Sequence, residues 1–371
     1  MLSKNNKGIT LVALVITIII LLILAGISIS VLTNTGIFGK AKEAKQKTED
    51  ATLEQNKILD NYEKEVDQYL PAFTGNTVKE AIQHGRVLNA TDNTELHDEK
   101  GNKIVVPAGF KVTGDATTID KGIVIEDATT GATSGNQFVW IPVGTITKTD
   151  GTTVDINLNR YAFDSNGIPT EKNEEVIDTY YSETASKGNT VAKSISNFKS
   201  SVTTNGGYYI GRYEARTTTA RNDKENALTQ ITEKGTDQIY NYVTQLQAAQ
   251  QVQGMYTSNN FTSDLMNSYA WDTATLFLQS CGTNTKYSRQ NSLNTLLSQV
   301  GTTNDKQCNV YDMASNVREW TTETSSHPDY SCVNRGGNSD RSELYTSNRD
   351  YYNTSYSNYN IGFRPLLYIN V

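Results

Sequence analysis

The segments NVYDMASNVREW at 309–320, RGG at 335–337 and IGFR at 361–364 decide the fold of this 371-residue chain. Within them, Trp320 and Phe363 carry rings large enough to anchor the junction of strands in a sheet. We therefore place both rings in the core of a C-terminal domain.

The same segments contain a candidate ion pair and three glycines. We expect Glu319 and Arg364 to form a buried pair that ties the last strand to the sheet, because arginine suits bidentate contact with a carboxylate. Gly336, Gly337 and Gly362 suit tight turns or a close approach of the backbone. We predict structural rather than catalytic roles for these residues.

Two further segments, NQFVWIPVG at 136–144 and GGYYIGRYEA at 206–215, precede the first three. In their order and spacing, these segments together resemble the formylglycine-generating-enzyme/sulfatase-modifying-factor domain, an elaborated relative of the C-type lectin fold. The resemblance covers residues 136–371. It implies an α+β, C-type-lectin-like domain, which we expect to extend over 100–371. The ring of Trp140 is large enough to make it a third core aromatic.

Local patterns predict the elements of this domain. Short β-type runs bounded by Gly, Pro, Asn or Asp predict strands at 104–106, 123–125, 138–141 and 208–210. Apolar residues at helical spacing predict helices at 243–255 and 265–278. The polar stretch at 145–205 is expected to be rich in loops.

The N-terminal part of the chain has a different character. Residues 9–32 include no charged side chain and would form a helix of about 36 Å, enough to cross a hydrocarbon core of roughly 30 Å. We therefore expect a single membrane-spanning helix at 9–33. The lysines after this span outnumber those before it, which by the positive-inside rule alone would favour a cytoplasmic body.

A helical stalk is expected at 34–71, after the span. Asn34, Gly36 and Gly39 are predicted to interrupt the helix, which resumes over 40–70 and ends before proline. The thin apolar stripe of this helix favours a solvated stalk. The alternative is the exposed half of a pilin-like helix that packs on a partner or on the body.

The first residues resemble the class III signal of type IV pilins and pseudopilins. A short basic leader at 1–8 ends in Lys7 and Gly8 and is followed by Ile9. The resemblance implies that a prepilin peptidase cleaves after Gly8, that Ile9 becomes the methylated N-terminus, and that the body is exported in spite of the lysine count. The usual glutamate of the fifth mature position is replaced by Ala13, which counts against assembly into a filament.

Composition excludes several classes of partner. The net charge of −7 argues against nucleic acid, which would require a basic surface. The cysteines are too few, and odd in number, for a disulfide framework, so that buried thiols and a single bridge both stay open. No two histidines have the spacing of a metal-binding pair. These residues are Cys281, Cys308, Cys332, His84, His97 and His327.

The chemistry of the resembled enzymes requires residues that are missing here. Formylglycine-generating members use two cysteines after the RGG-like turn as copper and thiol ligands, whereas Cys332 lies before the turn and no cysteine follows Asn338. Iron-dependent relatives use a histidine cluster. We therefore predict that the chain is not an enzyme and needs no cofactor. A structural calcium ion stays open, although no loop shows fixed ligand spacing.

The segment NRGGNSDRSELYTSNRDYYNTSYSNYN at 334–360 carries the functional prediction. Eighteen of its 27 residues are Asn, Tyr, Ser or Asp, which is typical of a paratope but also of a low-complexity surface loop. It further resembles the variable region of diversity-generating-retroelement target proteins, in which adenine-directed mutation of AAY codons yields these residues. The predicted ligand-binding residues are Asn338, Ser339, Asp340, Tyr345, Asn348, Asp350, Tyr351, Tyr352, Tyr356 and Tyr359.

Together these observations predict a membrane-anchored, surface-displayed, adhesin-like binding protein. It would cross the cell membrane once and hold its C-terminal domain outside. The expected partners are the membrane, a prepilin peptidase and a protein or glycan ligand whose identity the sequence leaves open. The alternatives are a minor pilin or pseudopilin associated with pilus components, and an active oxidase of the formylglycine-generating type.

Overall fold

The computed structural model describes residues 37–69, 72–172, 181–182, 193–235, 237–293, 297 and 303–371. The chain divides into two compact units, Met1–Pro71 and Ala72–Val371. The predicted leader, with Gly8 and Ile9, and the predicted span at 9–33 lie outside the described residues. Among the helices that are described, none combines the length and the apolar character that a membrane crossing requires.

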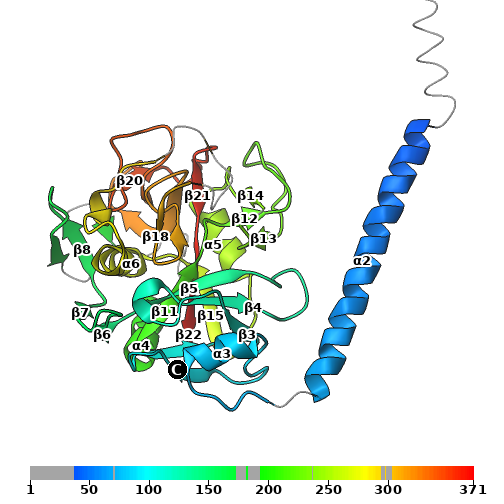
Figure 1. Ribbon diagram of the computed structural model, residues 1–371. Helices are drawn as coiled ribbons and strands as arrows, with labels where there is room; N and C mark the ends of the chain where they lie inside the picture. The colour runs from blue at the N-terminus through cyan, green and yellow to red at the C-terminus, as the bar shows by residue number, and fades with distance from the viewer. Residues whose placement is uncertain are drawn as a thin grey trace, which may run out of the picture. The chain divides into compact units, whose positions relative to one another are not determined.

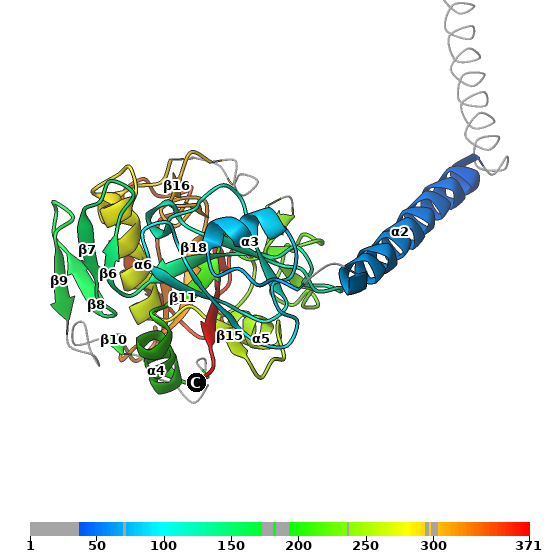
Figure 2. The same cartoon turned by 60° about the horizontal axis from the view of Figure 1, so that its bottom comes forward.

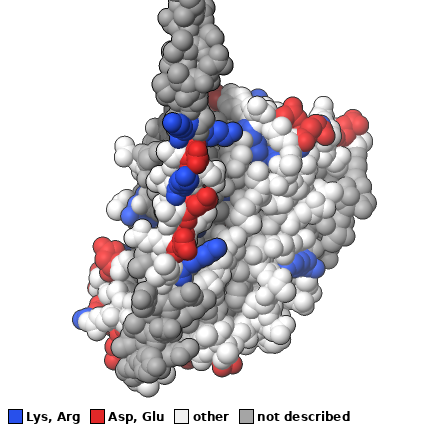
Figure 3. Space-filling model, turned by 90° about the vertical axis from the view of Figure 1, so that its right-hand side faces the viewer, with Lys and Arg blue, Asp and Glu red and all other residues white. Residues whose placement is uncertain are grey.

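The described part of the first unit is the helix α2, Ile37–Tyr69 (Figure 1). Its Lys, Glu, Ala and Gln residues are good helix formers, and exposed pairs such as Lys47–Glu43, 2.8 Å apart, add small increments. Figure 3 shows basic and acidic side chains interspersed along it. The helix expected over 40–70 is confirmed, but the interruption expected at Gly39 is wrong. One glycine costs only about 1 kcal/mol, which its neighbours outweigh.

The second unit is built on a six-stranded antiparallel sheet in the order β15-β22-β11-β5-β4-β3 (Figure 1). Every residue of the neighbouring inner strands β11 and β22 is buried, so this sheet forms the core. Three of the predicted strands, at 123–125, 138–141 and 208–210, are confirmed as β4, β5 and β11. The strands are β3 Phe110–Thr113, β4 Val124–Asp127, β5 Gln137–Pro142, β11 Gly207–Gly211, β15 Phe261–Leu265 and β22 Pro365–Ile369.

A second sheet carries the C-terminal motifs. Its order is β10-β18-β19-β20, and β21 pairs in parallel with β18. The strands are β10 Tyr181–Ser182, β18 Arg318–Ser325, β19 Cys332–Arg335, β20 Arg349–Tyr352 and β21 Ile361–Phe363. Only Arg364 separates β21 from β22, so the chain passes directly from this sheet into the first one.

Among the described residues, four α-helices complete the unit, and Figure 2 shows them around the strands. They are α3 Val78–His84, α4 Ile195–Asn205, α5 Gln245–Gln253 and α6 Ser268–Cys281. Helices α5 and α6 contact strands of both sheets. The helices predicted at 243–255 and 265–278 are confirmed, although α6 starts later than expected. Leu265 belongs to β15, and the Asn267 side chain caps α6 by accepting the N–H of Ala270.

Short hairpins fill the remainder of the unit. They are β1 Thr94–His97 with β2 Lys103–Val106, β6 Gly144–Thr147 with β7 Thr153–Ile156, β8 Arg160–Phe163 with β9 Pro169–Lys172, β16 Lys306–Gln307 with β17 Val310–Tyr311, and β12 Arg216–Thr217 with β13 Ile231–Thr232 and β14 Gln238–Ile239. The strand predicted at 104–106 is confirmed as β2.

The expectation that 145–205 is rich in loops is wrong for its described part. This stretch holds two hairpins and α4. Strands β6 and β7 bury little more than Ile146 and Ile156. Their remaining residues are mostly polar, so the sequence gives no clear strand pattern. The compact unit also begins at Ala72, upstream of the boundary expected at 100, because α3 and β3 pack together.

The predicted framework residues occupy the positions expected of them. Trp140, Trp320 and Phe363 are fully buried. Arg364 holds the Glu319 carboxylate with two nitrogens, Nε at 3.0 Å from Oε2 and Nη2 at 2.6 Å from Oε1. Its remaining donors reach backbone carbonyls of β11 and β17. The pair therefore joins the two sheets where the chain crosses between them.

The glycines of the framework permit close contacts. Gly336 has a φ of +87°, which favours glycine, and a Cβ on Gly337 would overlap the carbonyl of Ala314. A Cβ on Gly362 would lie 2.9 Å from the Val317 side chain. These contacts explain why the turn after β19 and the middle of β21 carry no side chain.

Candidate functional site

The segment predicted to bind ligand is fixed to the sheet at both ends. It runs from the end of β19 through β20 to the start of β21, and all three strands belong to the second sheet. Strand β20 lies at the sheet edge, paired with β19 through Asn334↔Asp350 and Arg335↔Arg349. Adjacent side chains of a strand point to opposite faces, so the predicted residues of β20 divide between two faces.

On one face, Arg318 of β18 organises a group that we name the Arg318 cluster. Its guanidinium, 2% exposed, forms an ion pair with Asp350, which is 29% exposed. Arg318 Nη2 also donates to the Tyr352 hydroxyl at 2.9 Å. The rings of Tyr352 and Tyr356 stack at 4.0 Å with 10° between their planes, and Trp320 meets Tyr352 edge-on. These contacts fix the two tyrosines before any ligand arrives.

A second group adjoins this cluster through the backbone. The hydroxyl of Tyr359 donates to Asp340 at 2.6 Å, and the Asn360 side chain donates to the same carboxylate at 2.7 Å. The Asn360 carbonyl accepts from the Arg318 N–H at 3.0 Å. The hydrogen bond to Asp340 raises the pKa of Tyr359, which is 40% exposed. The Tyr359 hydroxyl therefore stays protonated and acts as a donor.

On the other face of β20, Tyr351 belongs to an aromatic triad with His327 and Tyr330. The three ring centroids are 4.9–6.1 Å apart, and the His327 and Tyr351 planes are 26° from parallel. Tyr330 is 42% exposed. Sequence reasoning missed His327 and Tyr330 because they precede the Tyr/Asn/Ser-rich segment. A signal was available, because His327 and Tyr330 lie in the polar turn between β18 and β19. A turn at that position brings its aromatic rings close to the adjacent strand β20.

The remaining predicted residues have other surroundings. Tyr345 lies under the Arg289 guanidinium, 3.5 Å from its ring centroid. The Asn348 carbonyl accepts from Arg335 Nε at 3.0 Å. Asn338 is fully buried and Ser339 nearly so, so neither side chain is presented on the surface. The structure thus links five of the predicted side chains through Arg318 and Asn360, namely Asp340, Asp350, Tyr352, Tyr356 and Tyr359.

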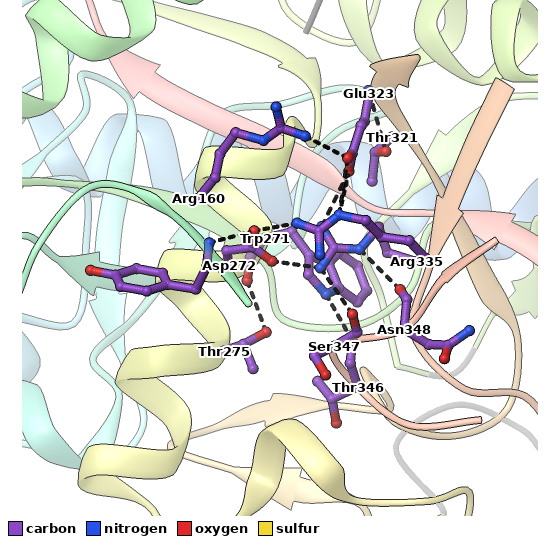
Figure 4. Close-up of polar contacts among 12 residues, drawn as sticks. Arg160, Trp271, Asp272, Thr275, Thr321, Glu323, Arg335, Thr346, Ser347 and Asn348 are labelled. Atoms are coloured by element: carbon purple, nitrogen blue, oxygen red, sulfur yellow. Dashed lines mark hydrogen bonds and ion pairs between the residues drawn. The ribbon is translucent and has the colours of Figure 1, made fainter. Parts of the chain in front are cut away.

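A buried charge network supports the triad face of β20. Arg160 and Arg335 reach Glu323 and Asp272 (Figure 4), with Arg160 Nη2 at 2.7 Å from Glu323 Oε1 and Arg335 Nη2 at 2.5 Å from Asp272 Oδ1. Arg349 of β20 contacts both acids. Burial alone would raise the pKa of Asp272, but Arg335 and Arg349 hold it below its usual value. The network therefore contains an ionised, paired aspartate.

The described residues offer no evident metal centre. No group of three or more His, Cys, Asp or Glu side chains in that part of the chain is arranged to hold a metal ion. Three cavities, of about 430, 280 and 440 Å³, are lined by other residues than the predicted ligand-binding set. The ten predicted residues therefore do not line these cavities.

No protein-family model matches the sequence, and no curated protein sequence matches it. Several solved structures resemble it in part. PvdO from Pseudomonas aeruginosa shares 12% identity over 64% of this chain and 95% of its own, with a TM-score of 0.35. The U1 variant of the Major Tropism Determinant shares 12% over 81% and 100%, with a TM-score of 0.31. Treponema denticola variable protein 1 shares 14% over 64% and 97%, with a TM-score of 0.28. At these scores, none of the three fixes the function of this chain.

Proposed function

We propose that this chain is a membrane-anchored, surface-displayed protein that binds a ligand through its C-terminal face without catalysis. The observation that carries the proposal is the preorganisation of partly exposed side chains. Tyr352 and Tyr356 are stacked and held by Arg318, and Tyr359 is held by Asp340. Rigid tyrosines lose little conformational entropy when they bind, so a fixed set of them is suited to recognition.

The ligand is a macromolecule with an extended surface, a protein or a glycan. The Arg318 cluster and the aromatic triad occupy opposite faces of the edge strand β20, because Tyr351 and Tyr352 are neighbours in a strand. A small molecule contacts one of these groups. A ligand large enough to surround the edge strand β20 contacts both groups.

The variable-region resemblance extends this proposal. Adenine-directed mutation would replace side chains of the segment and so change the ligand. The proposed face can accept such changes at Tyr351, Tyr356 and Tyr359, because these side chains are partly or largely exposed. At Arg349, substitution would remove a partner of both buried acids.

Export and anchoring rest on the N-terminal sequence. We propose cleavage after Gly8 by a prepilin peptidase, membrane insertion through 9–33 and an extracellular C-terminal unit. N-terminal sequencing of the membrane-bound protein would give a methylated Ile9. An uncleaved Met1 would contradict the proposed cleavage.

Association with pilus components is the second candidate function, and it is supported by the same leader. Co-purification of pilins with the native protein tests it.

Binding is tested with the full chain in lipid nanodiscs against a glycan array and a panel of purified cell-surface proteins. The decisive variant combines Tyr352→Ala, Tyr356→Ala and Tyr359→Ala. The matched control is Tyr213→Ala with Tyr311→Ala, a tyrosine pair stacked at 5.2 Å outside the segment. We expect the first variant to lose the signals of the natural protein and the control to keep them. Equal binding by the natural protein, the triple variant and the control would contradict the proposed face. Addition of EDTA to the same assay tests whether binding requires calcium.

A further inference from the structure

A cavity of about 430 Å³ lies where the end of α6 meets the β16–β17 hairpin. Its lining includes two cysteines that are distant in sequence. Cys281 is the last residue of α6, and Cys308 is the first residue of the hairpin turn. Both are free thiols and are partly exposed, whereas Cys332 is buried. The proposed binding face includes neither residue of this pair.

The backbone at Cys308 is unusual for a cysteine. Cys308 and Asn309 form the two-residue turn of a hairpin with the register Gln307↔Val310, and their φ angles are +44° and +63°. Positive φ at both central positions is the mark of a type I′ turn, which prefers asparagine and glycine. A cysteine in the left-handed region is strained. Strain of this kind is concentrated at functional positions.

Hydrogen bonds hold this turn against the end of α6. The Gln307 side-chain carbonyl accepts the N–H of Thr283 at 2.8 Å and that of Asn284 at 3.3 Å. On the other side of the turn, the Asn309 side chain donates to the Gly122 carbonyl at 2.8 Å. The turn is therefore fixed beside the residues that follow Cys281, and both thiols line one cavity.

We propose that Cys281 and Cys308 form an intrachain disulfide in the exported protein, and that Cys332 stays a thiol. The proposal rests on the exported location given above. Each thiol loses a proton and an electron, and the new S–S bond replaces two S–H bonds. A disulfide-type oxidant, such as glutathione disulfide, accepts the two electrons and leaves as two thiols.

The timing of the reaction follows from burial. Burial raises the pKa of the Cys281 thiol to about 12, and it raises that of Cys308 as well. The thiolate that attacks a disulfide is therefore scarce in the folded chain. The bridge accordingly forms while the chain folds after export.

The bridge would support the proposed binding face. It would close the loop from 281 to 308, which carries residues that hold the 345–347 part of the segment. The Gln290 carbonyl accepts the N–H of Thr346 at 3.1 Å, and the Ser288 carbonyl accepts that of Ser347 at 3.1 Å. Closing a loop removes freedom mainly from the unfolded chain. A bridged chain would therefore keep this support at temperatures at which the reduced chain loses it.

The test uses the full chain purified in detergent. The chain is unfolded in urea with a reductant, refolded in a glutathione redox buffer, unfolded again in urea that contains N-ethylmaleimide, digested and examined by mass spectrometry. We expect one peptide pair that joins Cys281 to Cys308, a mass lower by two hydrogens, and N-ethylmaleimide on Cys332. Three alkylated cysteines in the folded fraction, or glutathione on the two cysteines without a joined pair, would overturn the proposal.

Variants and a second readout complete the test. Cys332→Ser should keep the joined pair, and Cys281→Ser should leave Cys308 open to alkylation. The thermal midpoint of the bridged chain should exceed that of the reduced chain, and Cys308→Ser should abolish the difference. Because the reaction is carried out in solution without a ligand, it can fail while binding is retained, or succeed while binding is absent.

Discussion

The two faces of strand β20 show how one short segment combines framework and recognition. Arg349 lies within the Tyr/Asn/Ser-rich segment but contacts the buried acids Asp272 and Glu323. Tyr351, two residues later, packs against the rings of the aromatic triad, of which Tyr330 is 42% exposed. Two residues of one short strand therefore differ in how much their replacement would destabilise the chain. Burial of their partners, rather than composition, separates framework from binding residues.

The largest expected effect is on the framework. Asp272→Ala should lower the free energy of unfolding by about 3–5 kcal/mol, because it leaves buried Arg335 and Arg349 without their shared carboxylate. Urea denaturation followed by circular dichroism measures it. Asp115→Ala, at an exposed aspartate, is the control and should change little. An equal loss of unfolding free energy in Asp272→Ala and Asp115→Ala would show that the buried network does not stabilise the framework.

A second prediction compares two buried acids of opposite behaviour. Burial raises the pKa of Asp305 to about 6 from 3.8, whereas arginines lower that of Asp272. Asp305 therefore binds its proton more tightly in the folded chain. Its contribution to stability is complete below pH 3.8 and is lost as pH rises towards 6. The loss amounts to about 3 kcal/mol for this group.

Thermal midpoints between pH 4 and pH 7 test this sign. The natural chain should lose more stability over that interval than Asp305→Asn, whose side chain cannot ionise. An equal loss in the two proteins would show that Asp305 does not titrate in this range.

A smaller effect on the free energy of unfolding is expected at Asp350, which lies between the buried framework and the exposed binding residues. Asp350→Ala should destabilise the chain by about 1–3 kcal/mol, because Arg318 is buried and Asp350 is partly exposed. The double variant with Arg318→Met should cost less than the sum of the two single changes, since the residues interact directly. Additive costs in the urea titrations would argue against a working ion pair.

The smallest effect on stability is expected at Tyr351. Tyr351→Ala should change the free energy of unfolding by less than about 1 kcal/mol but weaken ligand binding roughly tenfold. Binding titration and urea denaturation of the same preparation separate the two quantities. A large loss of stability would assign Tyr351 to the framework instead.

The sequence allowed the framework to be predicted where its residues lie within short recognisable motifs. Glu319 with Arg364, the rings of Trp140, Trp320 and Phe363, and the turn glycines are local to such motifs. The network of Arg160, Asp272 and Glu323 could not be predicted, because its members come from β8, α6 and β18 and share no spacing.

The candidate site was predicted only in part, for a related reason. Composition identified the segment but carries no information on burial, so Asn338 and Ser339 were grouped with exposed residues. It also could not reveal that Tyr351 and Tyr352 point to opposite faces, because composition does not show that both residues belong to one strand. His327 and Tyr330 join the site only because β18, β19 and β20 are adjacent in the sheet.

The central claim is that replaceable binding residues are held on a fixed framework, and sequencing tests it most directly. Codons 334–360 would be sequenced in many isolates of the source population, together with flanking DNA that could carry a template copy. We expect adenine-directed substitutions at the codons of Tyr351, Tyr356 and Tyr359, and none at those of Arg335 and Arg349. An invariant segment, or substitutions that fall equally on the two arginines, would contradict the account.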